Sequence, residues 1–346
     1  MNNRLQNTSN TNRYDEYALM YDPDVAEAER SAEIRKARPK PKKKSEHAVV
    51  AELSNEADAR DGVFQTTYQP ARFEKVWLQE SLTPFYDTDY VKDVLAIVKG
   101  GKEANVYRCL GGPAAHAELV AAKVYRPRQF RNLSNDKMYR EGREVLAADG
   151  KVVKKNDHRT MRALGKKSSF GEQVAHTSWL MYEFNTLKHL YAAGAAVPKP
   201  LAVAENAILM GYVGNKQLAA PTLHEVGLDY PTARRLFEQV IQNIETMLSA
   251  NWIHGDLSAY NILYWEGEIT LIDFPQVTNA VGNSNARFIL TRDVQRVCDY
   301  FALQGLSVNA RGLADHLWQR FETRSEKEIL ADLSRTMAEY GEEKEE

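Results

Sequence analysis

Residues 254–277 read HGDLSAYNILYWEGEITLIDFPQV, and this stretch decides the fold class. It contains two short apolar runs, Ile262 to Trp265 and Ile269 to Ile272. The dipeptide Glu266-Gly267 separates them, and a glycine-containing turn between two apolar runs is typical of a β-hairpin. The stretch therefore predicts a hairpin with one polar loop before it and another after it.

Three polar side chains stand at the ends of this hairpin: Asp256 and Asn261 precede it, and Asp273 follows it. Phosphoryl transfer needs a group that orients or deprotonates the acceptor, and ligands that hold magnesium against the phosphates. Asp256 fits the first role, whereas Asn261 and Asp273 offer the hard oxygen ligands that Mg²⁺ prefers. A lone aspartate more often caps a loop, but this compound spacing favours a phosphotransfer site. His254 is predicted to brace the loop rather than to act chemically.

A second group of apolar runs lies upstream of the hairpin. Val94 to Val98 is strand-like, Gly100-Gly101 follows as a turn, and another run passes through Val106 and Tyr107. Glu118 to Tyr125 predicts one more strand. These runs predict a small sheet in the first half of the chain.

The third of these strands carries a lysine, Lys123, within the apolar sequence LVAAKVY. Burying a lysine is costly unless it has an anionic partner, so we expect a nucleotide phosphate and Glu183 to face it. Glu183 lies on a helix that we predict to begin at Ser178 and to end at Gly194. Taken singly, either charge also fits an exposed position at the end of an element.

Two motifs of the chain resemble the RIO family of atypical protein kinases. Residues 254–277 are similar to the family's catalytic and metal loops, which have the forms HxDLSxYN and IDFPQ. GGKEANVY at 100–107 resembles its phosphate loop STGKEANVY, although Gly100 stands where the family has a hydroxyl residue. The resemblance extends from about Tyr90 to Leu303. The absence of a winged-helix pattern in the first 60 or so residues favours the subfamilies that lack this domain.

The resemblance implies an α+β, bilobal, protein-kinase-like fold with a small sheet-rich N-lobe, a mainly helical C-lobe and no conventional activation loop. It implies four catalytic residues: Lys123, Glu183, Asp256 and Asp273. The residues expected to bind ATP are Gly100, Gly101, Lys102, Glu103, Ala104, Asn105, Val106, Lys123, Met210, Gly211, Val213 and Asn261. Asn261 and Asp273 are the expected ligands of Mg²⁺, with Mn²⁺ as an alternative ion. Without the family context, the glycine pair is a plain turn and residues 207–214 are a buried strand.

The pattern along the chain predicts five regions. They are a mostly disordered polar and basic extension (1–62), a lead-in segment (63–89), an N-lobe (90–213) with a mobile insertion at about 126–171, a C-lobe (214–325) and an acidic tail (326–346). In the C-lobe, Arg234 to Ala250 predicts a core helix, and Thr291 is expected to cap the last strong helix.

Composition sets few limits on function. Apolar residues make up 43% of the chain and the net charge is −2, which is typical of a folded protein with an ordinary surface. The two cysteines, Cys109 and Cys298, have no CxxC spacing, and no apolar run is long enough for a membrane span. We therefore expect a cytoplasmic protein. The basic run from Arg30 to Lys44 fits a solvated tail better than an RNA contact.

The predicted function is that of a RIO-type, ATP-dependent serine protein kinase and ATPase, with the γ-phosphoryl group passing to serine, to the enzyme itself or to water. The carboxylate of Asp273 is a further acceptor that the resemblance suggests. One alternative is a nucleotide-switched assembly factor that docks on ribonucleoprotein, such as the small ribosomal subunit. Another is a small-molecule kinase of the aminoglycoside-phosphotransferase type, which shares the H-x-D-x-x-x-x-N arrangement. No APE sequence follows Asp273, so we expect weak activity on general peptides.

Overall fold

The structure is a computed structural model, and the described residues belong to one compact unit, Glu52–Glu346. They are residues 66–101, 103–126, 137–141, 143–154, 156–166 and 168–323. The predicted extension (1–62), most of the basic insertion before residue 137 and the acidic tail (326–346) lie outside the described residues. The predictions for these segments, and the boundaries drawn from them, stay predictions.

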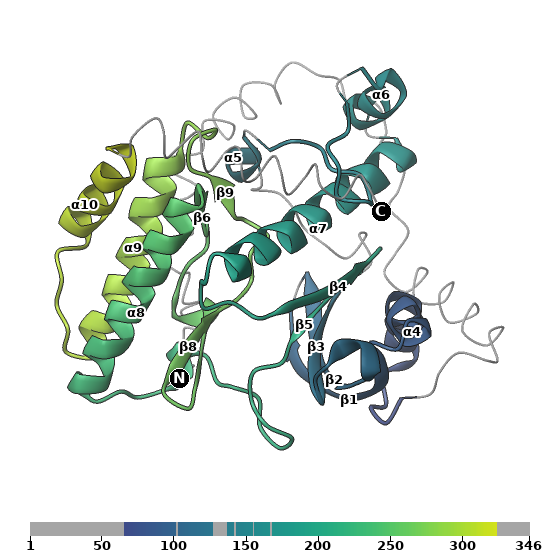
Figure 1. Ribbon diagram of the computed structural model, residues 1–346, viewed down its shortest axis with the longest axis horizontal. Helices are drawn as coiled ribbons and strands as arrows, with labels where there is room; N and C mark the ends of the chain where they lie inside the picture. Colours follow the sequence, from purple (N-terminus) through teal and green to yellow (C-terminus); the bar gives the residue numbers. More distant parts are fainter. Residues whose placement is uncertain are drawn as a thin grey trace, which may run out of the picture. The chain divides into compact units, whose positions relative to one another are not determined.

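The first half of this unit is built around a five-stranded antiparallel sheet (Figure 1). Its strands are β1 (Val91–Gly100), β2 (Ala104–Gly111), β3 (Leu119–Tyr125), β4 (Pro200–Ala204) and β5 (Ala207–Gly211), in the order β1-β2-β3-β5-β4. Four of these strands were predicted, but β4 was not. It begins with Pro200 at the edge of the sheet, where a residue without an N–H group costs no ladder hydrogen bond.

The register of the strands divides their side chains between two faces. Lys123 lies opposite Val106 of β2 and Ile208 of β5, and Ala121 lies opposite Met210. Opposite residues in antiparallel strands share a face, and so do residues two apart. These five residues therefore lie on one face, and the residues between them lie on the other.

The second face is covered by α4 (Arg72–Asp87), which lies beside the sheet (Figure 1). Its apolar side chains Trp77, Leu78, Leu82 and Phe85 are buried against residues of β1, β2 and β3. The predicted lead-in segment, residues 63–89, thus contains a helix that contributes to the core of the sheet-rich half.

The first face meets α7 (Ser169–Ala192), which begins nine residues before the predicted start at Ser178. Its N-cap is Ser168, whose hydroxyl accepts a hydrogen bond from the N–H of Gly171 at 3.1 Å. Ser178 lies inside the helix and accepts instead from the N–H of Leu146 at 2.9 Å. The described part of the predicted insertion also contains α5 (Lys137–Arg140) and α6 (His158–Lys166). The mobility of that insertion stays a prediction.

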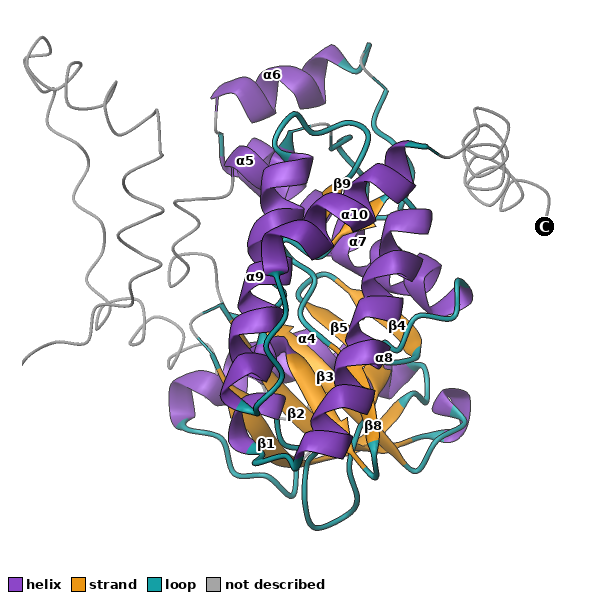
Figure 2. Ribbon diagram, turned by 90° about the vertical axis from the view of Figure 1, so that its left-hand side faces the viewer, coloured by secondary structure: helices purple, strands orange, loops and turns teal. Residues whose placement is uncertain are grey.

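The second half is mainly helical. It contains α8 (Tyr230–Ser249), α9 (Ala286–Leu303) and α10 (Ala310–Glu322), with the short strands β6 (Trp252–Ile253), β7 (Ile262–Trp265), β8 (Glu268–Leu271) and β9 (Thr278–Asn279). Figure 2 shows these helices in purple. They share one apolar core, within which Phe237 of α8 meets Phe301 of α9 edge to face at 5.3 Å. The predicted α+β division, with strands first and helices second, is confirmed.

Two predictions for this half had different outcomes. The hairpin is confirmed, because β7 pairs with β8 and the turn residues Glu266 and Gly267 both have positive φ, at 48° and 89°. The cap at Thr291 was wrong, because α9 already begins at Ala286 and the Thr291 hydroxyl donates to the carbonyl of Arg287 within the helix. A threonine can satisfy its hydroxyl inside a helix in this way, so its presence does not fix a helix start.

Within the described part of the chain, no helix is both long enough and apolar enough to cross a membrane. Cys109 and Cys298 are both buried as free thiols.

Candidate phosphotransfer site

Lys123 lies where the two halves of the unit meet. Its Nζ is 2.5 Å from Oε1 of Glu183 on α7 and 2.6 Å from Oδ1 of Asp273, which follows β8. The hydroxyl of Tyr125 donates to the other carboxylate oxygen of Glu183. Lys123 and Glu183 are only 8% and 4% exposed. The structure thus brings together three of the four predicted catalytic residues.

The charges of this cluster shift one another's protonation. Burial opposes the charge of Lys123, but Asp273 and Glu183 outweigh it and hold the pKa of the ammonium well above its usual value. Burial likewise raises the pKa of Asp273, yet the charge and hydrogen bond of Lys123 bring its pKa below the ordinary range. Lys123 is therefore a charged ammonium paired with two carboxylates, one from each half of the unit.

Asp273 occupies an unusual backbone conformation, with φ at +72°. Few residues other than glycine adopt this left-handed region, and such residues concentrate at functional sites. Its side chain is 42% exposed although one oxygen contacts buried Lys123. The other oxygen makes no hydrogen bond to any described residue, so it is accessible to a ligand from outside.

The fourth predicted catalytic residue, Asp256, lies on the loop between β6 and β7. Its Oδ1 accepts from Nη1 of Arg296 on α9 at 2.6 Å, and Nδ2 of Asn261 lies 3.3 Å from its Oδ2. The same amide group of Asn261 donates to the Asp256 carbonyl at 2.9 Å. Asn261 therefore points its NH₂ group at Asp256, which leaves its side-chain oxygen directed elsewhere. Asn261 and Asp273 flank the hairpin, where the Ile272 N–H donates to the Asn261 carbonyl.

His254 holds the two loops together, as predicted. The N–H of Asp256 donates to its Nδ1 at 3.3 Å, so Nε2 carries the proton and donates to the carbonyl of Ile272 at 3.1 Å. Its ring also packs on Phe274 at 4.8 Å. His254 thereby links the loop of Asp256 to the strand end that carries Asp273.

A second anchor of this loop comes from α9 and was not predicted. Gly255 has φ at +82°, and a Cβ there would lie 2.2 Å from the carbonyl oxygen of Gln276, so only glycine fits. Its N–H donates to buried Asp293 at 2.7 Å, and its carbonyl accepts from Arg292. The one sequence feature that pointed to this anchor was the placement of Arg292, Asp293 and Arg296 among apolar residues of the helix.

The glycine turn shows an unexpected orientation. There is no room for a side chain at Gly101, because a Cβ there would lie 2.7 Å from the Ala104 carbonyl oxygen. Val106 shares the face of Lys123, whereas the side chain of Asn105 lies on the opposite face, 4% exposed. Any contact between Asn105 and a nucleotide must therefore use its main chain. Lys102 lies outside the described residues, and Glu103 accepts the N–H of Arg126 with its carbonyl at 2.8 Å.

Three residues expected to bind ATP, Met210, Gly211 and Val213, lie at the end of β5 or just after it. Met210 shares the face of Lys123, as a residue behind an adenine ring must. The N–H of Gly211 donates to the Lys199 carbonyl, and the carbonyl of Val213 accepts from Ala220. Gly211, the last residue of β5, and Val213 just after it thus have part of their main chain already hydrogen-bonded.

Lys99 of β1 was missed by sequence reasoning. Its charge is the smallest of the causes that lower the pKa of Asp273, after Lys123 and His254. The pKa of Glu225 is lowered mainly by hydrogen bonds from Thr222, and Lys99 contributes to a smaller extent. Lys99 therefore adds positive charge to the neighbourhood of the site.

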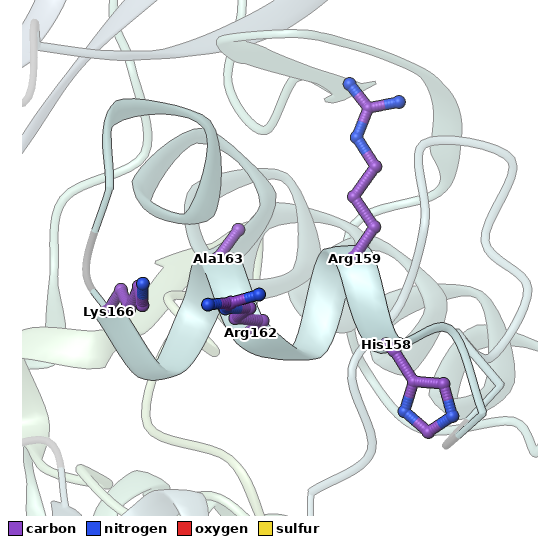
Figure 3. A pocket seen from close by; sticks show the side chains of 5 residues that line it. All are labelled: His158, Arg159, Arg162, Ala163 and Lys166. Carbon is purple, nitrogen blue, oxygen red and sulfur yellow. The ribbon is translucent and has the colours of Figure 1, made fainter.

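A surface depression lies on α6 (Figure 3). It is lined by His158, Arg159, Arg162, Ala163 and Lys166. None of these residues was a predicted site residue.

Comparison with known proteins gives the family. The RIO domain family matches residues 106–312. This segment is more than half of the 346 residues, so the chain belongs to the RIO domain family. Lys123, Glu183, Asp256, Asn261 and Asp273 all fall inside it.

Two relatives illustrate the similarity. The chain is 32% identical over 222 residues to the RIO-type serine/threonine-protein kinase Rio1 of Haloferax volcanii, covering 62% of this chain and 66% of the relative. It is 28% identical over 219 residues to the human serine/threonine-protein kinase RIO1, covering 63% of this chain and 35% of the relative. The matches thus span less than two thirds of the length of these relatives.

Among solved structures, the chain is similar to a Rio2 kinase–ADP/Mg²⁺–phosphoaspartate complex from Chaetomium thermophilum. The identity is 19% and the TM-score 0.47, with 89% of this chain and 88% of the other covered.

Proposed function

We propose that this protein is a RIO-type, ATP-dependent serine protein kinase and ATPase, which passes the γ-phosphoryl group to a serine hydroxyl, to the protein itself or to water. One observation carries the proposal. Lys123 of the sheet contacts a carboxylate from each half of the unit, Glu183 and Asp273. A buried cation held between the halves is the arrangement that positions a phosphate for transfer.

The residues present fit a magnesium ion. Asn261 and Asp273 supply an amide and a carboxylate oxygen on either side of the hairpin, and one oxygen of Asp273 is accessible as described above. No group of three or more His, Cys, Asp or Glu residues in the described chain offers a stronger metal site. Such a sparse oxygen set suits an ion that keeps water and phosphate among its ligands, as Mg²⁺ does. When bound, the ion would neutralise developing phosphate charge.

Asp256 is assigned to the acceptor. Arg296 and Asn261 engage its two oxygens, so the carboxylate is held in one orientation, while its side chain remains 39% exposed. An exposed, oriented carboxylate can position an incoming hydroxyl or water and accept its proton. Lys123, at the same time, offers its charge to the phosphates of ATP.

The acceptor is proposed to be something other than a general peptide. From Phe274 to Asn285 the chain forms only the short β9 before α9 begins, and no APE sequence occurs. This segment is already contacted by α5 and its neighbours. The side-chain amide of Asn283 donates to the Met138 carbonyl at 2.7 Å, and the Arg143 guanidinium donates to the main-chain carbonyls of Pro275 and Val277. The segment from Phe274 to Asn285 is therefore not free to form the peptide-binding surface that conventional protein kinases build after the metal-binding aspartate.

The test uses γ-labelled ATP and the full chain. Released phosphate, protein-bound label and label on unrelated peptides are measured in parallel, with Asp256→Asn as the inactive comparison. We expect the first two to exceed the third, and both to fall by about 100-fold or more in the variant. Absence of ATP turnover would contradict the proposed function, and efficient multiple turnover on unrelated peptides would contradict the proposed acceptor.

One observation favours a second role, that of a nucleotide-switched factor which docks on a polyanion such as ribonucleoprotein. Arg159, Arg162 and Lys166 form an exposed cationic surface on α6 (Figure 3). The two roles differ in the number of turnovers. A single slow turnover per binding event supports the switch, and sustained turnover supports the kinase.

A further inference from the structure

The buried carboxylate of Glu74 on α4 has no cationic partner among the described residues. It is 8% exposed, and its Oε1 accepts from the hydroxyl of Tyr107 at 2.5 Å. The hydroxyl of Tyr68 lies 3.3 Å from both carboxylate oxygens, and the N–H of Ala71 lies 3.4 Å from Oε2. Buried carboxylates are costly unless fully hydrogen-bonded, so the short bond from Tyr107 is the main compensation.

This bond fixes the direction of the next ones. A carboxylate only accepts, so the single proton of the Tyr107 hydroxyl points at Glu74. The hydroxyl oxygen can then only accept from Asn105, whose Nδ2 lies at 3.0 Å. With its NH₂ group turned toward Tyr107, the amide of Asn105 must turn its oxygen the other way.

The oxygen of Asn105 faces the glycine turn. The N–H of Gly101 donates to it at 3.3 Å, and Nη2 of Arg126 donates at 3.3 Å. A relay of hydrogen bonds with one fixed polarity thus runs from α4 through β2 to the main chain of the turn. Reversing the amide would place its NH₂ group against the Gly101 N–H, donor against donor.

We propose that Glu74 and Tyr107 are positioning residues of the nucleotide site: they fix the amide orientation of Asn105 and thereby the main chain of the Gly100–Gly101 turn. Neither side chain touches the nucleotide, because both lie on the face of the sheet that α4 covers. In this proposal α4 helps to position the nucleotide site, in addition to covering one face of the sheet. This inference rests on the proposed ATP-dependent function.

A purely structural role predicts a different result. If the relay only stabilised the fold, any loss of a hydroxyl from it would lower stability and leave nucleotide affinity unchanged. If the relay positions the turn, nucleotide affinity falls only when the removed hydroxyl is one that fixes the orientation of the Asn105 amide. Tyr68 and Tyr107 separate these cases, since both contact Glu74 but only Tyr107 contacts Asn105.

The experiment compares Tyr107→Phe with the matched control Tyr68→Phe in the full chain. The readouts are the Kd of a fluorescent ATP analogue, KM and kcat for ATP, and amide hydrogen exchange of residues 100–107. We expect Tyr107→Phe to raise Kd and KM by about tenfold with kcat at saturation within about twofold, and to speed exchange at the turn. Tyr68→Phe is expected to stay within about twofold of the wild type in all of these.

Two substitutions at Glu74 provide a second test of the relay. Glu74→Gln keeps an oxygen that accepts from Tyr107 and is expected to stay near the wild type, whereas Glu74→Leu removes the acceptor and should match Tyr107→Phe. If Tyr107→Phe does not fold, Asn105→Ala tests the last link and should give the same tenfold loss.

Equal nucleotide affinity and equal exchange in the Tyr107 and Tyr68 variants would overturn the inference. A wild type that binds no nucleotide would instead overturn the proposed function, and the exchange data would then decide the relay alone.

Discussion

The two faces of the five-stranded sheet carry similar pairs of residues with different neighbours. On one face Tyr125 donates to buried Glu183, and on the other Tyr107 donates to buried Glu74. The difference is a lysine. Lys123 stands beside Glu183 and reaches Asp273 in the second half of the chain. Among the described residues, the groups that contact the Glu74 carboxylate are two phenols and a main-chain N–H.

This comparison shows how one sheet can serve a site from both sides. The face with the lysine carries ion pairs that join the two halves, and we propose that Lys123 contacts the nucleotide there. On the other face Glu74 makes no ion pair with a described residue, and we propose that its hydrogen bonds orient the turn between β1 and β2. The following predictions test that division, beginning with the largest effect.

Lys123→Ala should lower ATP turnover by about 100-fold or more and leave the overall fold intact, because it removes the cation of the charged face. Turnover is measured as ADP release, and folding by circular dichroism. Lys216→Ala is the control, since Lys216 is an exposed lysine whose partner Glu118 is also exposed. Unchanged turnover, or a grossly unfolded variant, would contradict the assignment of the Lys123 face to catalysis.

Asp273→Ala should abolish turnover while raising the Kd for ATP much less, by about tenfold or under, because the carboxylate is assigned to the metal ion and not to the nucleotide itself. Single-turnover kinetics and equilibrium binding provide the two numbers. The matched substitution Asp315→Ala removes an exposed partner of Arg287 and should change neither. Near-normal turnover of Asp273→Ala in saturating Mg²⁺ would show that the assignment is wrong.

The smallest effect concerns stability and pH. Tyr107→Phe and Tyr125→Phe should each lower the free energy of unfolding by about 1–2 kcal/mol at pH 8, because each leaves a buried carboxylate without its short hydrogen bond. Burial, then the neighbouring glutamate, raises the pKa of both phenols above the usual value of 10. A raised folded-state pKa gives stability that is complete below pH 10 and is lost as the pH rises further.

The deficit of both variants relative to the wild type should therefore shrink above about pH 10, as measured by urea unfolding. Tyr191→Phe, at an exposed position, serves as the control and should follow the wild type. If the difference in the free energy of unfolding stays constant from pH 8 to 11, the prediction that both phenols have a raised pKa in the folded protein is wrong.

Local patterns were enough to predict the hairpin and the strand of Lys123. The turn at Glu266-Gly267 and the apolar runs beside it depend on a few neighbouring residues, so their structure follows from short-range preferences. The predicted starts of α7 and α9 were wrong because short-range preferences alone do not fix where a helix begins. Serine and threonine are good caps, but Ser178 and Thr291 satisfy their hydroxyls inside a helix, and only the neighbouring turns decide between the two positions.

Other features could not be predicted because they depend on distant contacts. α4 was missed because its apolar side chains gain their stability only against the sheet, and an isolated amphipathic segment of this length is marginal. Arg296 was missed because an arginine on a helix is ordinarily a surface charge, and its contact with Asp256 arises only when α9 packs beside the loop.

The sequence by itself determined the chemical inventory of this protein and its local spacing: an Asp and an Asn five residues apart, a hairpin, a second Asp beyond it, and a lysine within an apolar strand. The tertiary structure alone decided which of these groups meet. Lys123 contacts Asp273 across 150 residues, and Asn105 turns away from the face of Lys123 toward α4. The physical reason is that strand register assigns each side chain to one face of the sheet, and helix packing then decides which carboxylate each face receives.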